Sequence, residues 1–146
     1  MIFVSVGVGG SEEIVKKVDE IAQKLNEEVF IVLGNTKYVP KNCKWVISVP
    51  TIIPYVKKSH LVITHGGAGT IFECLNNGAR IITIAKRHAD DHQTDIIAEL
   101  ESRGYIINCP DINDLEKYIK SNVKLEKYNP PKSEIAAKIL KFLAKN

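Results

Sequence analysis

One stretch, residues 61–75 with the sequence LVITHGGAGTIFECL, most constrains what this chain can fold into. Its first four residues are apolar or β-branched without polar alternation, which is typical of a central parallel strand covered on both faces. Three glycines follow within four positions, and Ile71 and Leu75 then fall at helical spacing. The stretch therefore predicts a strand that ends in a glycine loop and opens a helix.

The glycine loop favours an anionic ligand, because the first N–H groups of a helix have no acceptor inside it and residues without a Cβ let an anion come close. Thr70 could cap the helix or donate its hydroxyl, and His65 could place a ring N–H beside the anion. Glu73, expected in the first helical turn, could accept from the hydroxyls of a ribose. The alternative is a tight turn with Glu73 as a solvated charge, and spacing alone leaves both interpretations open.

Strands and helices alternate along the rest of the chain. Apolar runs predict strands at these positions: 2–6, 29–33, 45–49, 80–85 and 105–107. Helical spacing and capping residues predict helices at these: 11–25, 52–57, 92–100, 111–120 with Asp111 or Asn113 as cap, and a last one within 130–146. The alternation predicts an α/β, Rossmann-like fold, a parallel sheet with helices on both faces, in a single domain.

Gly7, Val8 and Gly9 follow the first predicted strand. Ligands of parallel sheets bind outside the carboxyl ends of the strands, so this loop could line the same cleft, or it could simply turn the chain. Gly7-x-Gly9 is similar to the fingerprint of dinucleotide-binding proteins, but Glu12 occupies the third glycine position. The sequence therefore gives only weak support to an NAD(P) site.

A polar cluster, RHADDHQ at residues 87–93, follows the strand predicted at 80–85. Asp91, His92 and Gln93 could hydrogen-bond to the hydroxyls of a bound sugar. A metal site and a solvated, charged loop are the alternatives. No cysteine or HExxH-type spacing supports a metal, and we predict none.

The composition bounds the partners and the compartment. Twenty Lys and Arg against 17 Asp and Glu give a net charge of +3. With both signs interspersed we expect no nucleic-acid partner. No apolar run approaches the roughly 20 residues that cross a bilayer, and no signal peptide is evident, so we expect a cytoplasmic protein. Cys43, Cys74 and Cys109 lack metal-ligand spacing and should be reduced thiols, with Cys74 in the core.

Three motifs together resemble the donor-binding half of the GT-B glycosyltransferases, most closely the C-terminal domain of family 28. They are HGGAGT at 65–70, Glu73 three residues beyond Thr70, and DDHQ at 90–93. The opening FVSVGVGG at 3–10 also looks like the start of the short catalytic subunits of two-component UDP-sugar transferases. The likeness implies that residues 1–146 are a single GT-B C-terminal half, one nucleotide-sugar-binding domain.

The resemblance also implies a role for each matching residue. The roles are diphosphate binding for Gly66, Gly67, Ala68, Gly69 and Thr70, catalysis beside the diphosphate for His65, ribose binding for Glu73, and donor-sugar binding for Asp91, His92 and Gln93. Many relatives carry an acid where this chain has His92, so the sugar, GlcNAc or a similar hexose, stays open. Uracil would rest against backbone around residues 50–54. The UDP-sugar is a substrate, and no cofactor is implied.

The catalytic base and the acceptor site normally belong to the other GT-B half, which this chain lacks. The resemblance thus implies a donor-binding, catalytic subunit of an inverting UDP-sugar transferase, active with a membrane-associated partner that brings a lipid-linked acceptor. In isolation the chain could form a homodimer, and the helix at 130–146 would pack on the domain or on the partner. The alternatives are a non-catalytic nucleotide-sugar-binding or enhancer module of the same fold and, less favoured, an NAD(P)-binding protein.

Overall fold

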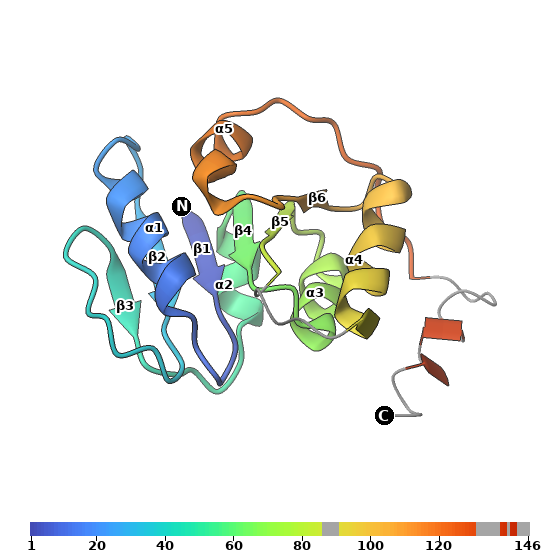
Figure 1. Cartoon of the computed structure of the whole chain (residues 1–146), viewed down its shortest axis with the longest axis horizontal. Coiled ribbons are helices and arrows are strands. Elements are labelled where there is room, and N and C mark those ends of the chain that lie inside the picture. The colour runs from blue at the N-terminus through green and yellow to red at the C-terminus, as the bar shows by residue number, and fades with distance from the viewer. Residues whose placement is uncertain (86–90, 131–137, 140, 143–146) are drawn as a thin grey trace.

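The computed structural model of the chain describes residues 1–85, 91–130, 138, 139, 141 and 142, and of Asp91 only the backbone. The described residues form a six-stranded parallel sheet. Its strands are β1 (Ile2–Ser5), β2 (Val29–Val32), β3 (Lys44–Val46), β4 (Leu61–Thr64), β5 (Ile81–Thr83) and β6 (Ile107–Asn108). Their order is β3-β2-β1-β4-β5-β6, so the first strand of the chain lies in the middle of the sheet (Figure 1).

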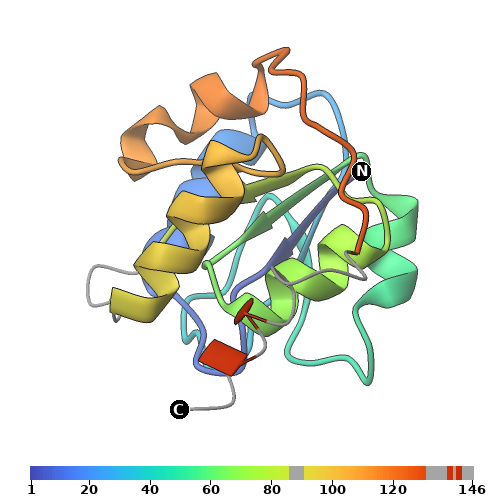
Figure 2. The same ribbon diagram turned by 90° about the vertical axis from the view of Figure 1, so that its right-hand side faces the viewer.

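The helices cover both faces of this sheet (Figures 1 and 2). They are α1 (Glu12–Ala22), α2 (Ile53–Lys58), α3 (Ala68–Asn76), α4 (Asp91–Ser102), the 3-10 turn η1 (Ile112–Asp114) and α5 (Leu115–Ile119). Successive strand residues point to opposite faces. Val4 and its neighbours pack with α1 and α5, and Phe3 and its neighbours pack with α2, α3 and α4. The predicted α/β, Rossmann-like class is confirmed.

The edge strand β3 is shorter than the strand predicted at 45–49. Its neighbour β2 turns away at Gly34, which adopts a φ of +57°. The Gly34 N–H still donates to the Ile47 carbonyl at 2.9 Å, but this is where the pairing with β2 stops. The strand ends early because β2 is the only strand beside β3 and because β2 turns away at Gly34.

The strand predicted at 105–107 was misplaced by about two residues. The Tyr105 N–H donates to the Leu100 carbonyl at 3.0 Å and so closes α4 instead of joining the sheet. The pairing of β6 with β5 begins at Ile107, opposite Ile82. Capping of the preceding helix, which strand propensity does not capture, decides this boundary.

Helix starts agree better with the sequence. Ser11 is the N-cap of α1, as predicted, and its hydroxyl accepts from the Ile14 N–H at 3.4 Å. Of the two predicted caps near residue 112, the structure selects Asp111, whose carboxylate accepts from the Asn113 N–H at 2.9 Å. The helix predicted at 111–120 is divided into η1 and α5.

Two carboxylates of α1 hold the connection between β2 and β3. Asp19 is only 2% exposed. It accepts from the Tyr38 hydroxyl at 2.7 Å, from the Asn42 N–H at 2.7 Å and from the Lys41 N–H at 3.0 Å. Two turns earlier on the same helix, Glu12 accepts from the backbone N–H groups of residues 37 and 38. These bonds fix a connection that has no regular structure of its own.

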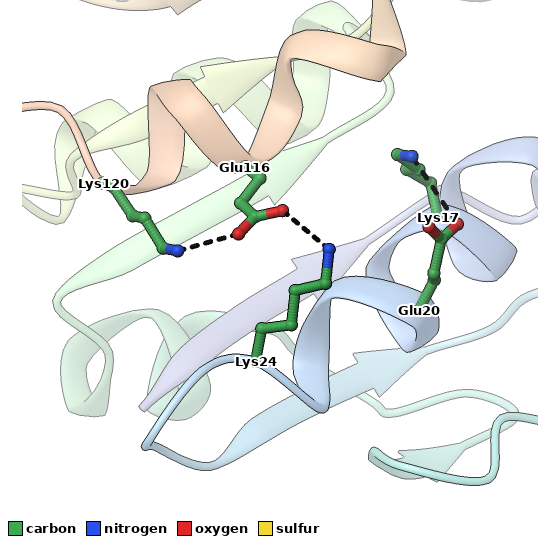
Figure 3. A network of polar contacts seen from close by, with 5 residues as sticks. All are labelled: Lys17, Glu20, Lys24, Glu116 and Lys120. Carbon is green, nitrogen blue, oxygen red and sulfur yellow. Dashed lines mark hydrogen bonds and ion pairs between the residues drawn. The ribbon is translucent and has the colours of Figure 1, made fainter.

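An ion-pair network joins α5 to the end of α1 (Figure 3). Glu116 lies between Lys24, at 3.3 Å, and Lys120, at 2.7 Å, and Lys17 pairs with Glu20 nearby on α1. These side chains are solvent-exposed or partly so, and such pairs contribute little to stability. Within the parts of the chain that the structure describes, no helix has the length and apolar character needed to cross a bilayer.

Candidate functional site

The topology brings the predicted site loops to one edge of the sheet. β1, β4 and β5 are neighbours and parallel, with Ser5 opposite Thr64 and Thr64 opposite Thr83. The chain therefore leaves all three strands at the same edge, into residues 6–10, 65–70 and 84–85. Ligands of parallel sheets bind at this edge.

The ring of His65 lies between two glycines from different loops. A Cβ on Gly7 would lie 2.7 Å from the ring Cε1, and a Cβ on Gly67 would lie 2.6 Å from the ring Nε2. The ring Nδ1 is 3.4 Å from the hydroxyl oxygen of the buried Thr64. Both glycines are thus required by packing, and they place the imidazole where β1 and β4 end.

Gly66 serves packing on the other side of the same loop. Its φ is +86°, and a Cβ there would lie 2.8 Å from Cδ1 of Ile97 in α4 and 3.7 Å from the Cα of Ala85. The glycine loop therefore lies directly against α4 and the end of β5. A side chain at Gly66 would separate these elements.

The amino end of α3 has backbone amides without an acceptor inside the helix. Gly67 is the N-cap, and the Ile71 N–H donates to its carbonyl at 3.0 Å. The N–H groups of Ala68, Gly69 and Thr70 therefore have no acceptor inside the helix. A Cβ on Gly69 would meet no atom within 4 Å, so one side of this turn is open. Such a turn can receive an anion.

Two sequence expectations about this helix were wrong. Thr70 is not the cap, because the helix begins at Ala68 with Gly67 in the capping position. Glu73 consequently falls beyond the first turn, which contains no acidic residue. Glycine is an acceptable N-cap, so the chain enters the helix earlier than the side chains suggest. The roles of the Thr70 hydroxyl and the Glu73 carboxylate in ligand binding stay predictions.

The polar cluster after β5 is described only in part. Residues 87–90 lie outside the described part of the chain, as does the side chain of Asp91, whose backbone begins α4. His92 is exposed and Gln93 is partly buried in the first turn of α4. The ring of His92 makes an edge-to-face contact with Phe142, with centroids 4.6 Å apart. Sequence reasoning missed this contact because it joins residues that are distant along the chain.

Sequence reasoning also missed the contribution of the loop after β2. A Cβ on Gly34 would lie 2.1 Å from the Gly7 carbonyl oxygen, and the Asn35 N–H donates to the Val8 carbonyl at 2.9 Å. The Gly34-Asn35 pair was the available signal, since it repeats the pattern of a glycine directly after an apolar strand. The loop that follows β1 is therefore fixed from two sides. Gly9, its third predicted member, is exposed.

A cavity of about 310 Å³ opens at the same edge, beside the ends of β5 and β6. Its lining includes Glu13 from the first turn of α1, Ala85 after β5, and Asp111 and Asn113 after β6. None of these was a predicted site residue. Only their position in the sequence could have identified them, because each follows a strand or opens a helix at the carboxyl edge of the sheet.

The three cysteines are not suited to act as nucleophiles at this edge of the sheet. All three are free, as expected, and Cys74 is buried in α3. Burial, with a smaller effect of the nearby Glu73 charge, raises the pKa of the Cys74 thiol to about 12. Burial also raises the pKa of Cys43 to about 12 and that of Cys109 to about 11. At neutral pH these thiols stay protonated, which disfavours thiolate chemistry.

Known proteins resemble the chain in sequence and in fold. Over 69 residues it is 32% identical to the UDP-N-acetylglucosamine transferase subunit ALG13 of Candida albicans, a match that covers 47% of this chain and 23% of that protein. An NMR structure of ALG13 matches 97% of this chain and 94% of that one, with a TM-score of 0.63 and 19% identity. MurG of Acinetobacter baumannii matches 81% of this chain and 39% of that one, with a TM-score of 0.66 and 18% identity.

These matches differ in what they establish. The structural matches have low sequence identity and show the fold alone. The chain spans about a quarter of the Candida albicans subunit and well under half of MurG. The family model for the glycosyltransferase family 28 C-terminal domain, in contrast, matches residues 1–145, nearly the whole chain. The chain belongs to the glycosyltransferase family 28 C-terminal domain family.

Proposed function

We propose that this chain is the donor-binding, catalytic subunit of a two-component inverting glycosyltransferase. It would transfer GlcNAc or a similar hexose from a UDP-sugar to a lipid-linked acceptor that a membrane-associated partner holds. The observation that carries this proposal is the open amino end of α3. Three amides of residues 68–70 lie there beside His65, at the edge where parallel sheets bind their ligands.

The diphosphate of the donor would sit on the amino end of α3. Gly69 leaves room for phosphate oxygens to approach the amides of Ala68, Gly69 and Thr70. His65, held between Gly7 and Gly67, would donate a ring N–H to the same group. Because these donors are already oriented, they can stabilise negative charge without reorganising.

The remaining predicted residues would bind the sugars of the donor. Glu73, partly exposed on α3, would accept from the ribose hydroxyls. His92 and Gln93 in the first turn of α4 would contact the hexose, and Asp91 begins the same turn. Gly66 supports this arrangement, because its packing against Ile97 keeps α4 next to the glycine loop.

The reaction would be a displacement at the anomeric carbon. An acceptor hydroxyl attacks that carbon, its proton passes to a base on the partner, and the bond to the β-phosphate oxygen breaks. The bonding electrons leave with UDP, where the amides of α3 and His65 stabilise the new charge. In this division the donor half stabilises the leaving group, and the partner supplies the base and the acceptor.

The NAD(P) alternative fits the loop after β1 poorly. In a dinucleotide fingerprint the glycines leave space for a pyrophosphate. Here the space over Gly7 is filled by the ring of His65. Calorimetry with UDP, UDP-GlcNAc and NADH tests the choice. We expect binding of the two uridine ligands and none of NADH, and tight NADH binding with UDP ignored would refute the proposal.

Mixing experiments separate a catalytic subunit from a non-catalytic module. Both would bind UDP, but only a catalytic subunit combined with its partner transfers sugar to a lipid-linked acceptor. The matched control is the His65→Ala variant in the same mixture. We expect it to bind the partner normally and to transfer sugar at least about tenfold more slowly, as loss of one preorganised donor does.

A further inference from the structure

The net positive charge of the chain comes from one continuous segment that contains no acidic residue. Residues 29–72 contain five lysines and no Asp or Glu, so all 17 acidic residues lie elsewhere. The expectation of evenly interspersed charge fails for this segment. Its lysines are Lys37, Lys41, Lys44, Lys57 and Lys58. The segment includes the edge strand β3 and the loops on either side of it.

The same region carries most of the exposed large apolar side chains of the described residues. Val8 is 85% exposed, Ile47 65%, Val39 56% and Trp45 38%. Two backbone hydrogen bonds of 2.9 Å join their loops. The Asn35 N–H donates to the Val8 carbonyl, and the N–H of the preceding Gly34 donates to the Ile47 carbonyl. We call these four side chains the β3 rim. Trp45 lies on β3, which is at the left of Figure 1, Val39 and Ile47 lie in the loops on either side of it, and Val8 lies in the loop after β1.

Three acidic groups that contact residues 37–44 are engaged in hydrogen bonds or ion pairs. Glu12 accepts from backbone N–H groups at residues 37 and 38, and Asp19 is buried under the same connection. Glu28 pairs with Lys44 at 2.6 Å, at the amino end of β3. The side chains of Lys37 and Lys41 are exposed beside Val39. The exposed Lys37 and Lys41 therefore add positive charge beside an exposed apolar side chain of the rim.

We propose that the β3 rim is a docking surface for the anionic face of a phospholipid bilayer. Protruding apolar side chains enter the boundary between headgroups and acyl chains, tryptophan favours that boundary, and flanking lysines attract anionic headgroups. Exposed apolar side chains that cluster on a protein surface often mark a site of interaction with a protein or a membrane. The absence of acids across residues 29–72 favours an anionic bilayer over a basic or neutral protein surface.

This docking would orient the candidate site. Val8 directly follows Gly7, which covers the ring of His65. A bilayer that contacts Val8 and Ile47 would lie close to the carboxyl edge of the sheet. A lipid-linked acceptor would then reach this edge without leaving the membrane. The docking itself depends only on the rim and would hold even if the donor were not a UDP-sugar.

The fluorescence of Trp45 can test this proposal, because Trp45 is the single tryptophan of the chain. We expect the emission of Trp45 to shift to shorter wavelength when the full chain is mixed with phosphatidylcholine vesicles that contain phosphatidylglycerol. Brominated acyl chains should quench it. Vesicles of phosphatidylcholine alone should give a much weaker response, and added salt should weaken binding to the anionic vesicles.

Matched variants locate the surface. Ile47→Asp should reduce binding to the anionic vesicles about tenfold or more, since an isoleucine tip is lost from the apolar phase. Val123→Asp changes an exposed valine outside the β3 rim and should bind like the unmodified chain. Lys41→Glu changes only an exposed side chain and should also weaken binding. It therefore tests the surface independently if Ile47→Asp fails to fold.

Three results would overturn the inference. The first is no response of Trp45 to anionic vesicles, and the second is equal loss of binding in Ile47→Asp and Val123→Asp. The third is a chain that ignores vesicles but loses a co-purifying partner protein when Ile47 is changed, which would assign the rim to a protein. UDP calorimetry on Ile47→Asp reports separately on the proposed function, because Ile47 takes no part in the donor site.

Discussion

At the scale of single residues, the glycines of the loop at 65–70 have different structural roles. Gly66 and Gly67 are fixed by neighbours, Ile97 for the first and the ring of His65 for the second. Gly69 has open space on the side where a Cβ would project. A glycine-rich motif is usually explained as a whole by its ligand. Here only one of three glycines is left for the ligand to explain.

This difference predicts opposite results for two alanine variants. Gly67→Ala should displace the His65 ring and reduce stability by about 1–3 kcal/mol, as overpacking does. Gly69→Ala should keep or raise stability, by up to about 1 kcal/mol, because alanine is the better helix former. It should nevertheless weaken UDP binding if phosphate oxygens approach that amide. Thermal melts and UDP calorimetry on both variants measure the two effects, and unchanged UDP affinity in Gly69→Ala would argue against a diphosphate at this turn.

Glu73 allows a second test at this scale. We expect Glu73→Ala to weaken UDP binding roughly tenfold or more, as expected for a hydrogen bond to a charged group, with a nearly unchanged melting temperature. Its carboxylate is only partly buried, so little packing is lost. Glu101→Ala, at an exposed position on α4, is the control. A large drop in melting temperature with unaltered affinity would make Glu73 a structural residue.

At the scale of elements, the carboxylate of Asp19 links α1 to the β2–β3 connection and makes that link sensitive to acid. Burial alone would raise the pKa of Asp19, but the N–H groups of Lys41 and Asn42 and the Tyr38 hydroxyl together lower it below its ordinary value of 3.8. A lowered folded-state pKa stabilises the fold above the unfolded value. This stabilisation is therefore fully present at neutral pH and lost as the pH falls below about 4.

We expect Asp19→Asn to destabilise the chain by about 1–3 kcal/mol at pH 7, because buried donors lose a charged acceptor. Below pH 4 the difference between the variant and the unmodified chain should shrink. Urea unfolding between pH 7 and pH 3 measures both effects. Glu20→Gln, on the exposed side of the same helix, should show neither, and a constant difference across this range would contradict the assignment.

The sequence predicted elements better than it predicted their ends. Apolar runs and helical spacing identified the sheet, its parallel class and the loop order at its carboxyl edge, because these follow from local periodicity. The start of α3 and the register of β6 depend on capping by Gly67 and on the bond from Tyr105 to Leu100. These boundaries depend on backbone hydrogen bonds that form only in the folded chain, and the preferences of single residues do not encode them.

At the scale of the whole molecule, the site is a product of topology. Convergence of the loops was predictable from parallel strands, but the seat of His65 between Gly7 and Gly67 required the pairing of β1 with β4. The contact of His92 with Phe142 and the engagement of Glu12 and Asp19 are of the same kind. Long-range contacts of side chains cannot be read from spacing along one chain.

The central position of β1 also governs when the protein can fold. Ile2 is synthesised before both strands that flank its own, β2 at Val29 and β4 at Leu61. A growing chain must therefore keep this apolar strand without its second neighbour until β4 has been synthesised and has left the ribosome. Nascent chains cut before Leu61 should rely on chaperones, and refolding should be slow for a protein of this size, as sheets built from distant segments generally are.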